Sequence, residues 1–449
     1  MKSLAVAGLL FLPTLLVAQA PGAVPAPPPP MELNARPISL DEAVRLAHQF
    51  HPQTVQARGQ LRSSSANLRR SYAAFLPSLN FSASSGYSTG VTYFQGELVP
   101  NRGDPWSFRN GLNASLTLFD GGSRFREITA SRADQAAAES NTTLREFEVA
   151  LSVKQQYYNV LAAREAESAA RVQFEQAQQN FRVANARVQA GAATKSDSLR
   201  SAIELRNAEI AILQAQQDVR NASASLTRFT GQKSLVTAVP GDTLEPITLA
   251  GDSTSLFSIA QQAPAVRTAT ASLAAANASS KAAMAPYWPT LSMSANYGVN
   301  QSSRGFSGGN LWLMGESGNP NSKGVSFSLS YPLFNGLQRE TAVIQARVAQ
   351  DNAEASLRDA QLAAEQSLIQ AYGVYELAQA RIELQQASVE AAEEDLRVQR
   401  QRYELGAGTL LDVLTSQSTL NQARLSLIQA RRDARVAKAQ IEAIVGRDL

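Results

Sequence analysis

The 449-residue chain has no cysteine, only two histidines and only 7% aromatic residues. The lack of cysteine excludes a disulfide framework and thiolate chemistry, and we also expect no lipid anchor on an N-terminal cysteine. Because the net charge is only +3, we predict no nucleic-acid partner. Few aromatic residues beside abundant Ala, Gln, Arg and Glu are typical of long helices rather than of a thick globular core.

Long apolar runs are equally scarce, and the one candidate stands at the start of the chain. Lys2 precedes an apolar run over residues 4–17, which is followed by Ala18-Gln19-Ala20. Because this run is too short for a membrane-spanning helix, residues 1–20 are interpreted as a signal peptide, and the proline-rich residues 21–37 as a stiff linker. No later run of 18 apolar residues occurs, so we expect an exported protein without a transmembrane helix.

Side chains that commonly carry chemistry are also sparse. His48 and His51 stand near an expected helix break with no acidic cluster beside them, so we predict no metal site. The run Glu393-Glu394-Asp395 lies on an expected helix, where a solvated face explains it better than an acid/base pair. We therefore predict no catalytic residue, no cofactor and no enzymatic activity.

The chain does contain an internal repeat. Residues 75–79 (FLPSL) match residues 287–291 (YWPTL) at an offset of 212, and Phe119 matches Phe334 at an offset of 215. The only change in length between the copies falls between residues 79 and 119. We therefore predict two structural repeats, joined by a connector. The first covers residues 38–230, the connector 231–254 and the second 255–449.

Each repeat has two segments in which apolar and small polar residues alternate. Alternation over about ten residues predicts strands of the length that crosses a membrane in a tilted orientation. A soluble sandwich is the alternative, but it would bury more Val and Ile. The loops around residues 94–106 and 305–320 are expected to face outwards. The predicted strands cover residues of about 79–88, 107–119, 290–300 and 324–334.

Aromatic residues stand at one end of every predicted strand, as in the interfacial belt of a membrane barrel. Four strands cannot close a barrel, and each unpaired backbone group of an open edge in lipid would cost several kcal/mol. We therefore predict an oligomer in which every copy gives four strands to one barrel. The belt residues are Phe75, Phe119, Tyr287, Trp288 and Phe334.

Two segments of 69 residues, 122–190 and 337–405, contain nothing that breaks a helix. Each helix would be about 100 Å long and would need lateral partners. Heptads with a large residue in one column and Ala in the other predict return helices over residues 196–230 and 411–445. Shorter helical segments, 39–76 with a break near Pro52 and 255–287, have the lengths to stack end to end on the return helices. A tube of antiparallel helices fits these lengths, whereas a simple coiled-coil spacer leaves the strand pairs unexplained.

Nearly the same turn follows each long helix. Gly191 and Gly406 are expected to end the two helices in the left-handed conformation. Residues 194–197 and 409–412 both read Thr-x-x-Asp, which predicts a capping box at the start of each return helix.

Strand pairs, paired long helices, a repeat and these turns together resemble the TolC-like outer membrane efflux protein family. The most specific similarity lies in residues 402–446, which begin RYELGAGTLLDVL, and in residues 38–58, ISLDEAVRLAHQFHPQTVQAR. The resemblance implies a mainly α fold with a membrane β-barrel: a homotrimer with a 12-stranded barrel in the outer membrane of a Gram-negative bacterium. A long α-helical barrel would continue it into the periplasm, where an adaptor protein and an inner-membrane pump dock.

The resemblance also implies roles for residues at the turns. It makes Asp412 part of a carboxylate ring at the constriction, and it makes Tyr403 and Asp197 lock partners between neighbouring helix pairs. The hydroxyl of Tyr403, which stands three residues before Gly406, is expected to donate to Asp197. A packing role, in which Tyr403 only fills the heptad column of Val389 and Leu396, is the alternative. The adaptor would dock at the tip, at Gly191, Thr194, Gly406, Gly408 and Thr409.

Two positions depart from the family pattern. Gly408 stands where some members carry a locking Arg, and Thr415 where some carry a second ring acid. The function implied is an export duct for small molecules or polypeptides. The alternative is a structural or adhesive trimeric coiled-coil surface protein with a β-barrel anchor, which gives no reason for two similar strand pairs in one chain.

Overall fold

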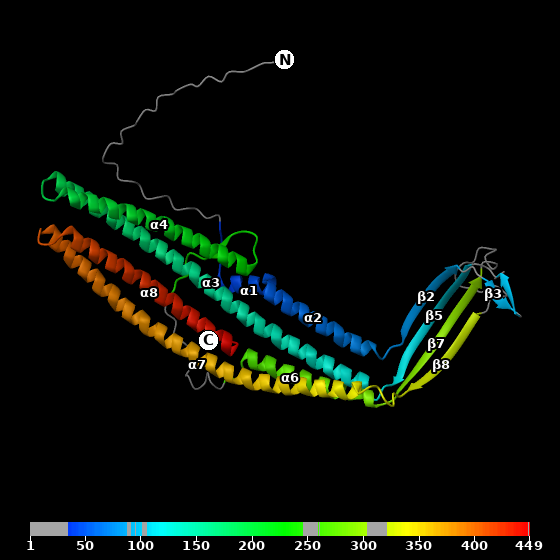
Figure 1. Ribbon diagram of the computed structural model, residues 1–449. Helices are drawn as coiled ribbons and strands as arrows, with labels where there is room; N and C mark the ends of the chain where they lie inside the picture. Colours follow the sequence, from blue (N-terminus) through cyan, green and yellow to red (C-terminus); the bar gives the residue numbers. More distant parts are fainter. Residues whose placement is uncertain are drawn as a thin grey trace, which may run out of the picture. The chain divides into compact units, whose positions relative to one another are not determined.

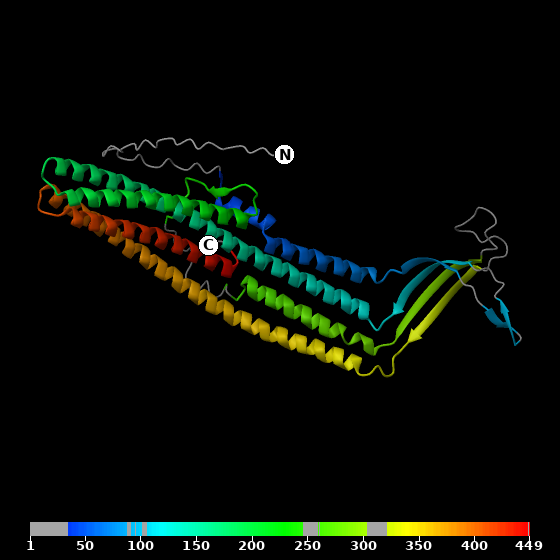
Figure 2. The ribbon, with the colours of Figure 1, turned by 45° about the horizontal axis from the view of Figure 1, so that its top comes forward.

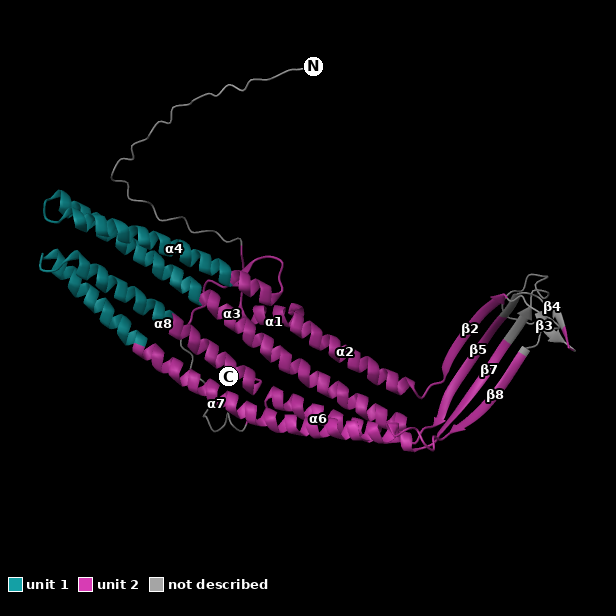
Figure 3. Cartoon of the chain, in the orientation of Figure 1, with its two compact units in different colours: residues 1–34, 162–222, 385–428 teal, residues 35–161, 223–384, 429–449 magenta. Residues whose placement is uncertain are grey.

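The computed structural model describes residues 35–87, 91–94, 96–100, 106–245, 259, 261–302, 321–447 and 449. The predicted signal peptide, most of the linker, the loop 305–320 and part of the loop 94–106 lie outside the described residues. The chain divides into two compact units, which Figure 3 colours separately. Among the described residues, unit 1 comprises 162–222 and 385–428, and unit 2 comprises the remainder.

Unit 2 contains a four-stranded antiparallel sheet with the order β2-β5-β7-β8 (Figure 1). The pairing of β5 with β7 joins the first repeat to the second within one sheet. The strands are β2 (Ser78–Tyr87), β5 (Trp106–Phe119), β7 (Thr290–Ser302) and β8 (Asn321–Ser330). β8 ends four residues before its predicted end, shortly ahead of Pro332, which has no N–H to give to a ladder.

The alternation of residues gives the sheet two different faces. Leu291 of β7 lies opposite Leu329 of β8, whereas the next position pairs two serines, Ser292 and Ser328. Because successive side chains of a strand point to opposite faces, one face is apolar and the other carries hydroxyls. In the single chain Leu329 is 72% exposed, so the apolar face lacks a cover.

Four short strands form two further pairs that the sequence pattern did not indicate. β1 (Arg36–Ile38) pairs in parallel with β6 (Val236–Ala238), within a region expected to be linker. The pair is fixed by Ile38, which is buried. β3 (Val91–Phe94) and β4 (Glu97–Pro100) form a hairpin inside a segment expected to be a loop, and Gly96 takes a φ of +87° at its turn.

Short helices of unit 2 lie beside the long ones (Figures 1 and 2). They are α1 (Leu40–Phe50), α2 (Pro52–Ala73), α6 (Pro264–Ala282) and the 3-10 turn η1 (Ala285–Tyr287). The break between α1 and α2 falls at His51, because Pro52 cannot continue α1 but suits the first position of α2. α2 contacts α3 through the hydroxyls of Ser71 and Ser131, which are 2.8 Å apart.

The long helices α3 (Ser123–Gln189) and α7 (Gln338–Glu404) each contain 67 residues, on the order of 100 Å. The return helices α4 (Lys195–Thr230) and α8 (Leu410–Val445) each contain 36. None of the helices among the described residues contains the continuous apolar stretch that a membrane-spanning helix requires.

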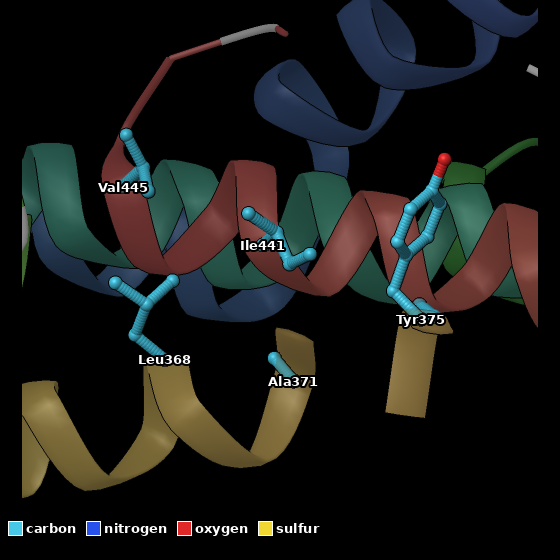
Figure 4. Packing of buried hydrophobic residues seen from close by; sticks show 6 residues of the cluster. Leu368, Ala371, Tyr375, Ile441 and Val445 are labelled. Carbon is cyan, nitrogen blue, oxygen red and sulfur yellow. The ribbon is translucent and has the colours of Figure 1, made fainter. Parts of the chain in front are cut away.

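Heptad side chains hold α7 against α8 in unit 2 (Figure 4). Leu368, Ala371 and Tyr375 of α7 pack against Ile441 and Val445 of α8. Ile441 is fully buried, and burial of a side chain of this size stabilises the folded state by roughly 1.5–3 kcal/mol. In unit 1 the same seam type joins α3 to α4 through Phe174, Leu205 and Ile212.

One glycine is required where strand β5 passes to helix α3. Gly121 has a φ of +65°, and a Cβ added there would lie 2.1 Å from the Cβ of Trp288. The backbone of the first repeat therefore packs directly on the indole of the second.

Candidate functional site

The two hairpin turns of unit 1 share one construction. Gly191 follows α3 and Gly406 follows α7, with φ angles of +72° and +74°. In each turn the alanine after the glycine donates its N–H to the carbonyl five residues before it, at 2.8 Å. These bonds make the Schellman motif, which satisfies carbonyls that the end of a helix would leave free.

Each return helix starts with reciprocal capping. The N–H of Thr194 donates to the carboxylate of Asp197 at 3.1 Å, and the N–H of Asp197 donates to the Thr194 hydroxyl at 3.3 Å. Thr409 and Asp412 repeat the arrangement at 2.9 Å and 3.3 Å. Both capping boxes expected from the sequence are thus formed.

Capping fixes the charge of Asp412. The backbone N–H of Thr409, followed by its hydroxyl, lowers the pKa of the Asp412 carboxyl below its ordinary value, and Arg402 adds a smaller effect in the same direction. The side chain is exposed at the start of α8. Asp412 is therefore a fixed negative charge at neutral pH, held in one orientation.

Tyr403 lies in the seam between α7 and α8. Its ring packs against the buried residues Leu396, Val413 and Leu420. Its hydroxyl is buried and has no hydrogen-bond partner among the described residues. The predicted bond from this hydroxyl to Asp197 is not formed within the described part of one chain, where the Asp197 carboxylate accepts from Thr194.

Arg187 joins the first hairpin to the second. Its Nη1 donates to the carbonyl oxygen of Tyr403 at 2.7 Å, and its guanidinium carbon lies 4.5 Å from the centre of the Tyr403 ring. One side chain of α3 thus holds both the backbone and the ring of a residue at the end of α7. A hydrogen bond from a charged group and a cation–π contact are both stronger than contacts between neutral groups.

A second bridge lies one heptad before Arg187. The amide nitrogen of Asn180 in α3 donates to the amide oxygen of Gln417 in α8 at 2.7 Å. Gln417 is 1% exposed and its own amide nitrogen has no partner in the described chain. Such a bond favours this alignment of the two helices, because another alignment would leave the buried amide oxygen of Gln417 without a partner as well.

Gly408 has a structural reason to lack a side chain. A Cβ at this position would lie 3.1 Å from the Cβ of Arg402 and 3.3 Å from the backbone nitrogen of Tyr403. A locking arginine would therefore require the turn to widen. Thr415 donates its hydroxyl to the Leu411 carbonyl at 2.9 Å and carries no charge.

The bridging residues escaped sequence reasoning for different reasons. Arg187 looks like any arginine in the last turn of a helix. Its equivalent Arg402 forms only two long hydrogen bonds among the described residues, to Gln399 and to the Ala407 carbonyl, at 3.5 Å each. Gln417 did leave a signal: it interrupts the apolar seam of Leu410, Val413 and Leu420, which a search for polar seam positions would have found.

The other predicted positions lie in unit 2. His48 contacts the Glu146 carbonyl and His51 caps α2, so both histidines have local structural partners. No group of three potential metal ligands occurs in the part of the chain that the structure describes. The aromatic residues of the predicted belt gather where strands meet helices, and four of them are well exposed: Phe119, Tyr287, Trp288 and Phe334.

Comparison with known proteins gives two matches to one family model, described as outer membrane efflux protein, over residues 43–232 and 257–447. Protein CyaE of Bordetella pertussis is 28% identical over 423 residues, which cover 92% of this chain and 85% of the relative. The pyoverdine export outer membrane protein OpmQ of Pseudomonas aeruginosa is 27% identical over 346 residues, covering 76% and 69%. The solved structure of the outer membrane protein VceC from Vibrio cholerae has a TM-score of 0.71 at 19% identity, covering 91% of this chain and 96% of that one.

Proposed function

Because the chain belongs to the outer membrane efflux protein family, we propose that three copies close a 12-stranded barrel and a helical tunnel, forming an export duct. The observation that carries this proposal is the four-stranded sheet, whose apolar face is exposed and whose order ends at β2 and β8 in a single chain. In lipid such edges must pair with another copy. Three sheets of four strands give a closed barrel of an ordinary size.

The long helix α7 also has a surface that suits contact with another copy. Large apolar side chains remain exposed along α7, among them Ile344, Leu362, Ile369 and Leu384. Exposed apolar residues at intervals along a helix are best explained by contact with helices of another copy. Members of this family work with a periplasmic adaptor and an inner-membrane pump.

The gate of the duct lies at the turns of unit 1 in this proposal. With three copies around one axis, three Asp412 carboxylates approach one another, repel and attract cations. The Thr409 bonds hold each carboxylate in place and favour its charged form against that repulsion. The pore would therefore select for cations as well as narrow at this point.

Closure needs contacts that an adaptor can break. We assign this role to Arg187 on Tyr403 and to Asn180 on Gln417, which tie the first hairpin to the second within each copy. In this proposal Tyr403 contributes to closure because its carbonyl and ring bind Arg187. Asp197 contributes because its bonds with Thr194 hold the first turn in one conformation. The adaptor would meet the exposed turn residues Gly191, Thr194, Gly406 and Thr409, together with Gly408.

The cargo follows only by similarity. OpmQ is named for pyoverdine export, and a small-molecule cargo suits a wide duct lined by hydroxyl groups. A structural or adhesive surface protein would need neither the hydroxyl-lined face nor the charged turn.

Planar bilayers and cross-linking test this proposal together. Cross-linking of the detergent-extracted protein is expected to stop at trimers, and these trimers are expected to conduct ions in a planar bilayer. A stable monomer that keeps its strands, or trimers that never conduct, would contradict the export duct.

A further inference from the structure

A pocket of about 740 Å³ lies in unit 2 where the strands meet the helices of the second repeat. It is lined by the start of α3, the end of α6 with η1, and the first turns of α7. Its volume falls in the range of small-molecule binding sites.

All the charged residues that line this pocket are basic. Arg126, Lys281 and Arg347 line it, and none of its lining residues is acidic. Arg126 donates to the Lys281 carbonyl at 3.4 Å, but neither Lys281 nor Arg347 has a carboxylate partner among the described residues. Three cations around one hollow repel one another unless an anion lies between them.

A fourth cation, Arg339, lies near the pocket residue Tyr287, and it differs from its equivalent in the first repeat. In the first repeat Arg124 lies 4.6 Å from the centre of the Phe75 ring, and Asp120 pairs with it at 2.9 Å. In the second repeat Arg339 lies 5.1 Å from the centre of the Tyr287 ring, and Asn335 stands at the position of Asp120.

Because Asn335 is uncharged, Arg339 has no equivalent of the ion pair that Arg124 forms with Asp120. Its Nε and Nη1 atoms are buried and have no hydrogen-bond partner among the described residues. The next residue, Glu340, forms no ion pair with it in the described chain, and its Oε2 is likewise buried without a partner. Tyr287 lines the pocket, and Arg339, which does not itself line it, contacts the ring of that tyrosine.

Apolar groups surround these charges. Phe125 is 68% exposed and Trp288 is 54% exposed, and both line the pocket. Exposed aromatic rings beside arginine and lysine are typical of the level at which lipid headgroups lie. The strands, with their exposed apolar face, begin immediately beyond.

We infer that this pocket binds the phosphate of an anionic glycerophospholipid of the outer membrane, with Lys281, Arg347 and Arg126 around the phosphate and Arg339 against the ring of Tyr287. The acyl chains would lie against Phe125 and Trp288. This inference rests on the export duct proposed above, because it needs the sheet to stand in a membrane. The first repeat is expected to bind no such lipid, because Asp120 already pairs with Arg124 where β5 passes to α3.

The repeats supply a matched test in the full-length oligomer. Lys281→Gln with Arg347→Gln removes two pocket cations, whereas Arg69→Gln with Arg132→Gln removes their equivalents in the first repeat. The detergent-extracted oligomer would be delipidated and mixed with phosphatidylglycerol, and native mass spectrometry would count the molecules that remain bound, with phosphatidylcholine and inorganic phosphate as comparison probes. The parent and the first-repeat variant are expected to retain phosphatidylglycerol, and the pocket variant to bind it roughly tenfold or more weakly.

Several results would overturn the inference. Equal retention of phosphatidylglycerol by the pocket variant and the parent would remove the lipid site. Competition by inorganic phosphate at equal concentration would indicate a site for free anions. A pocket variant that loses the oligomer whether or not lipid is added would indicate that a carboxylate of another copy fills the pocket. Conductance of the parent in a planar bilayer separates these outcomes from a failure of the export duct itself.

Discussion

The two turns of unit 1 agree in their backbones and differ in what their side chains reach. Both have a left-handed glycine, a 2.8 Å closing bond and a Thr–Asp capping pair. Yet Arg187 crosses to the other hairpin, while its equivalent Arg402 stays at its own turn. Gln417 is a buried amide where the first repeat has Ala202. Duplication therefore preserved what ends a helix, and the copies diverged in the residues that join one hairpin to the other.

The largest expected effect concerns the strand-to-helix junctions. Gly121→Ala meets both a positive φ and Trp288, whereas Gly336→Ala meets a positive φ of +66° with open space around it. The left-handed conformation costs about 1–2 kcal/mol in either variant, and the clash adds about 1–3 kcal/mol for Gly121 alone. Thermal unfolding of the extracted oligomer, followed by circular dichroism, should rank Gly121→Ala well below Gly336→Ala. Equal melting temperatures would mean that Trp288 moves aside freely.

The next effect concerns the gate. Arg187→Ala removes a charge-assisted hydrogen bond and a cation–π contact, together about 2–3 kcal/mol in each copy. The resting conductance of the channel in a planar bilayer should rise. Arg402→Ala is the matched control, because it removes the same side chain from the equivalent turn but breaks no contact between hairpins. If the two variants conduct alike, Arg187 does not hold the tip closed.

A smaller effect is expected from charge at the turns. Asp412→Asn should reduce selectivity for cations, whereas Asp197→Asn should leave it nearly unchanged, because only Asp412 forms the carboxylate ring in the proposed duct. Since the bonds from Thr409 lower the pKa of Asp412, the charged form and the stability it contributes persist at neutral pH and are lost only as pH falls through that lowered value. Reversal potentials measured from pH 7 downwards should therefore keep their cation preference through the ordinary titration range of Asp. Loss of the preference already near pH 5 would indicate that repulsion within the ring outweighs the capping bonds.

The smallest effect is expected at the Tyr403 hydroxyl. Tyr403→Phe keeps the ring and the carbonyl that Arg187 holds, and it removes a buried hydroxyl without a partner among the described residues. Stability should be unchanged or rise by up to about 1 kcal/mol, and resting conductance should match the parent. A marked rise in conductance would instead support the hydroxyl bond to Asp197, formed between copies.

Local rules in the sequence predicted local structure well. Glycine followed by Thr-x-x-Asp marked both turns because each residue type satisfies a particular backbone group there. Alternation marked the strands because one face must be apolar. The hairpin of β3 and β4 was missed because its strands are too short to show a period, and β1 was missed because it lies in a proline-rich segment.

Contacts between hairpins could not be read in the same way. Nothing near Arg187 in the sequence indicates Tyr403, which is 216 residues away. The equivalent Arg402 bonds only to residues near its own turn within the described part of the chain. The sequence has Asn335 where the first repeat has Asp120, but it does not show that Arg339 lies buried without another hydrogen-bond partner among the described residues. Such features depend on which side chains the fold brings together, and periodicity carries no information about that.

The equal lengths of the paired helices constrain how such a chain can evolve. α3 and α7 both have 67 residues, and α4 and α8 both have 36, although the repeats differ in length elsewhere. Inserting one residue in a long helix would rotate every following seam residue by about 100°, turning Leu and Ala columns away from their partners. The length of a helical hairpin can therefore change without loss of seam contacts only when whole heptads are added or removed. The same change must be made in the long helix and in its return helix. Loops between strands have no seam to keep in register, so residues can be added there singly. The difference in length between the two repeats falls in that region.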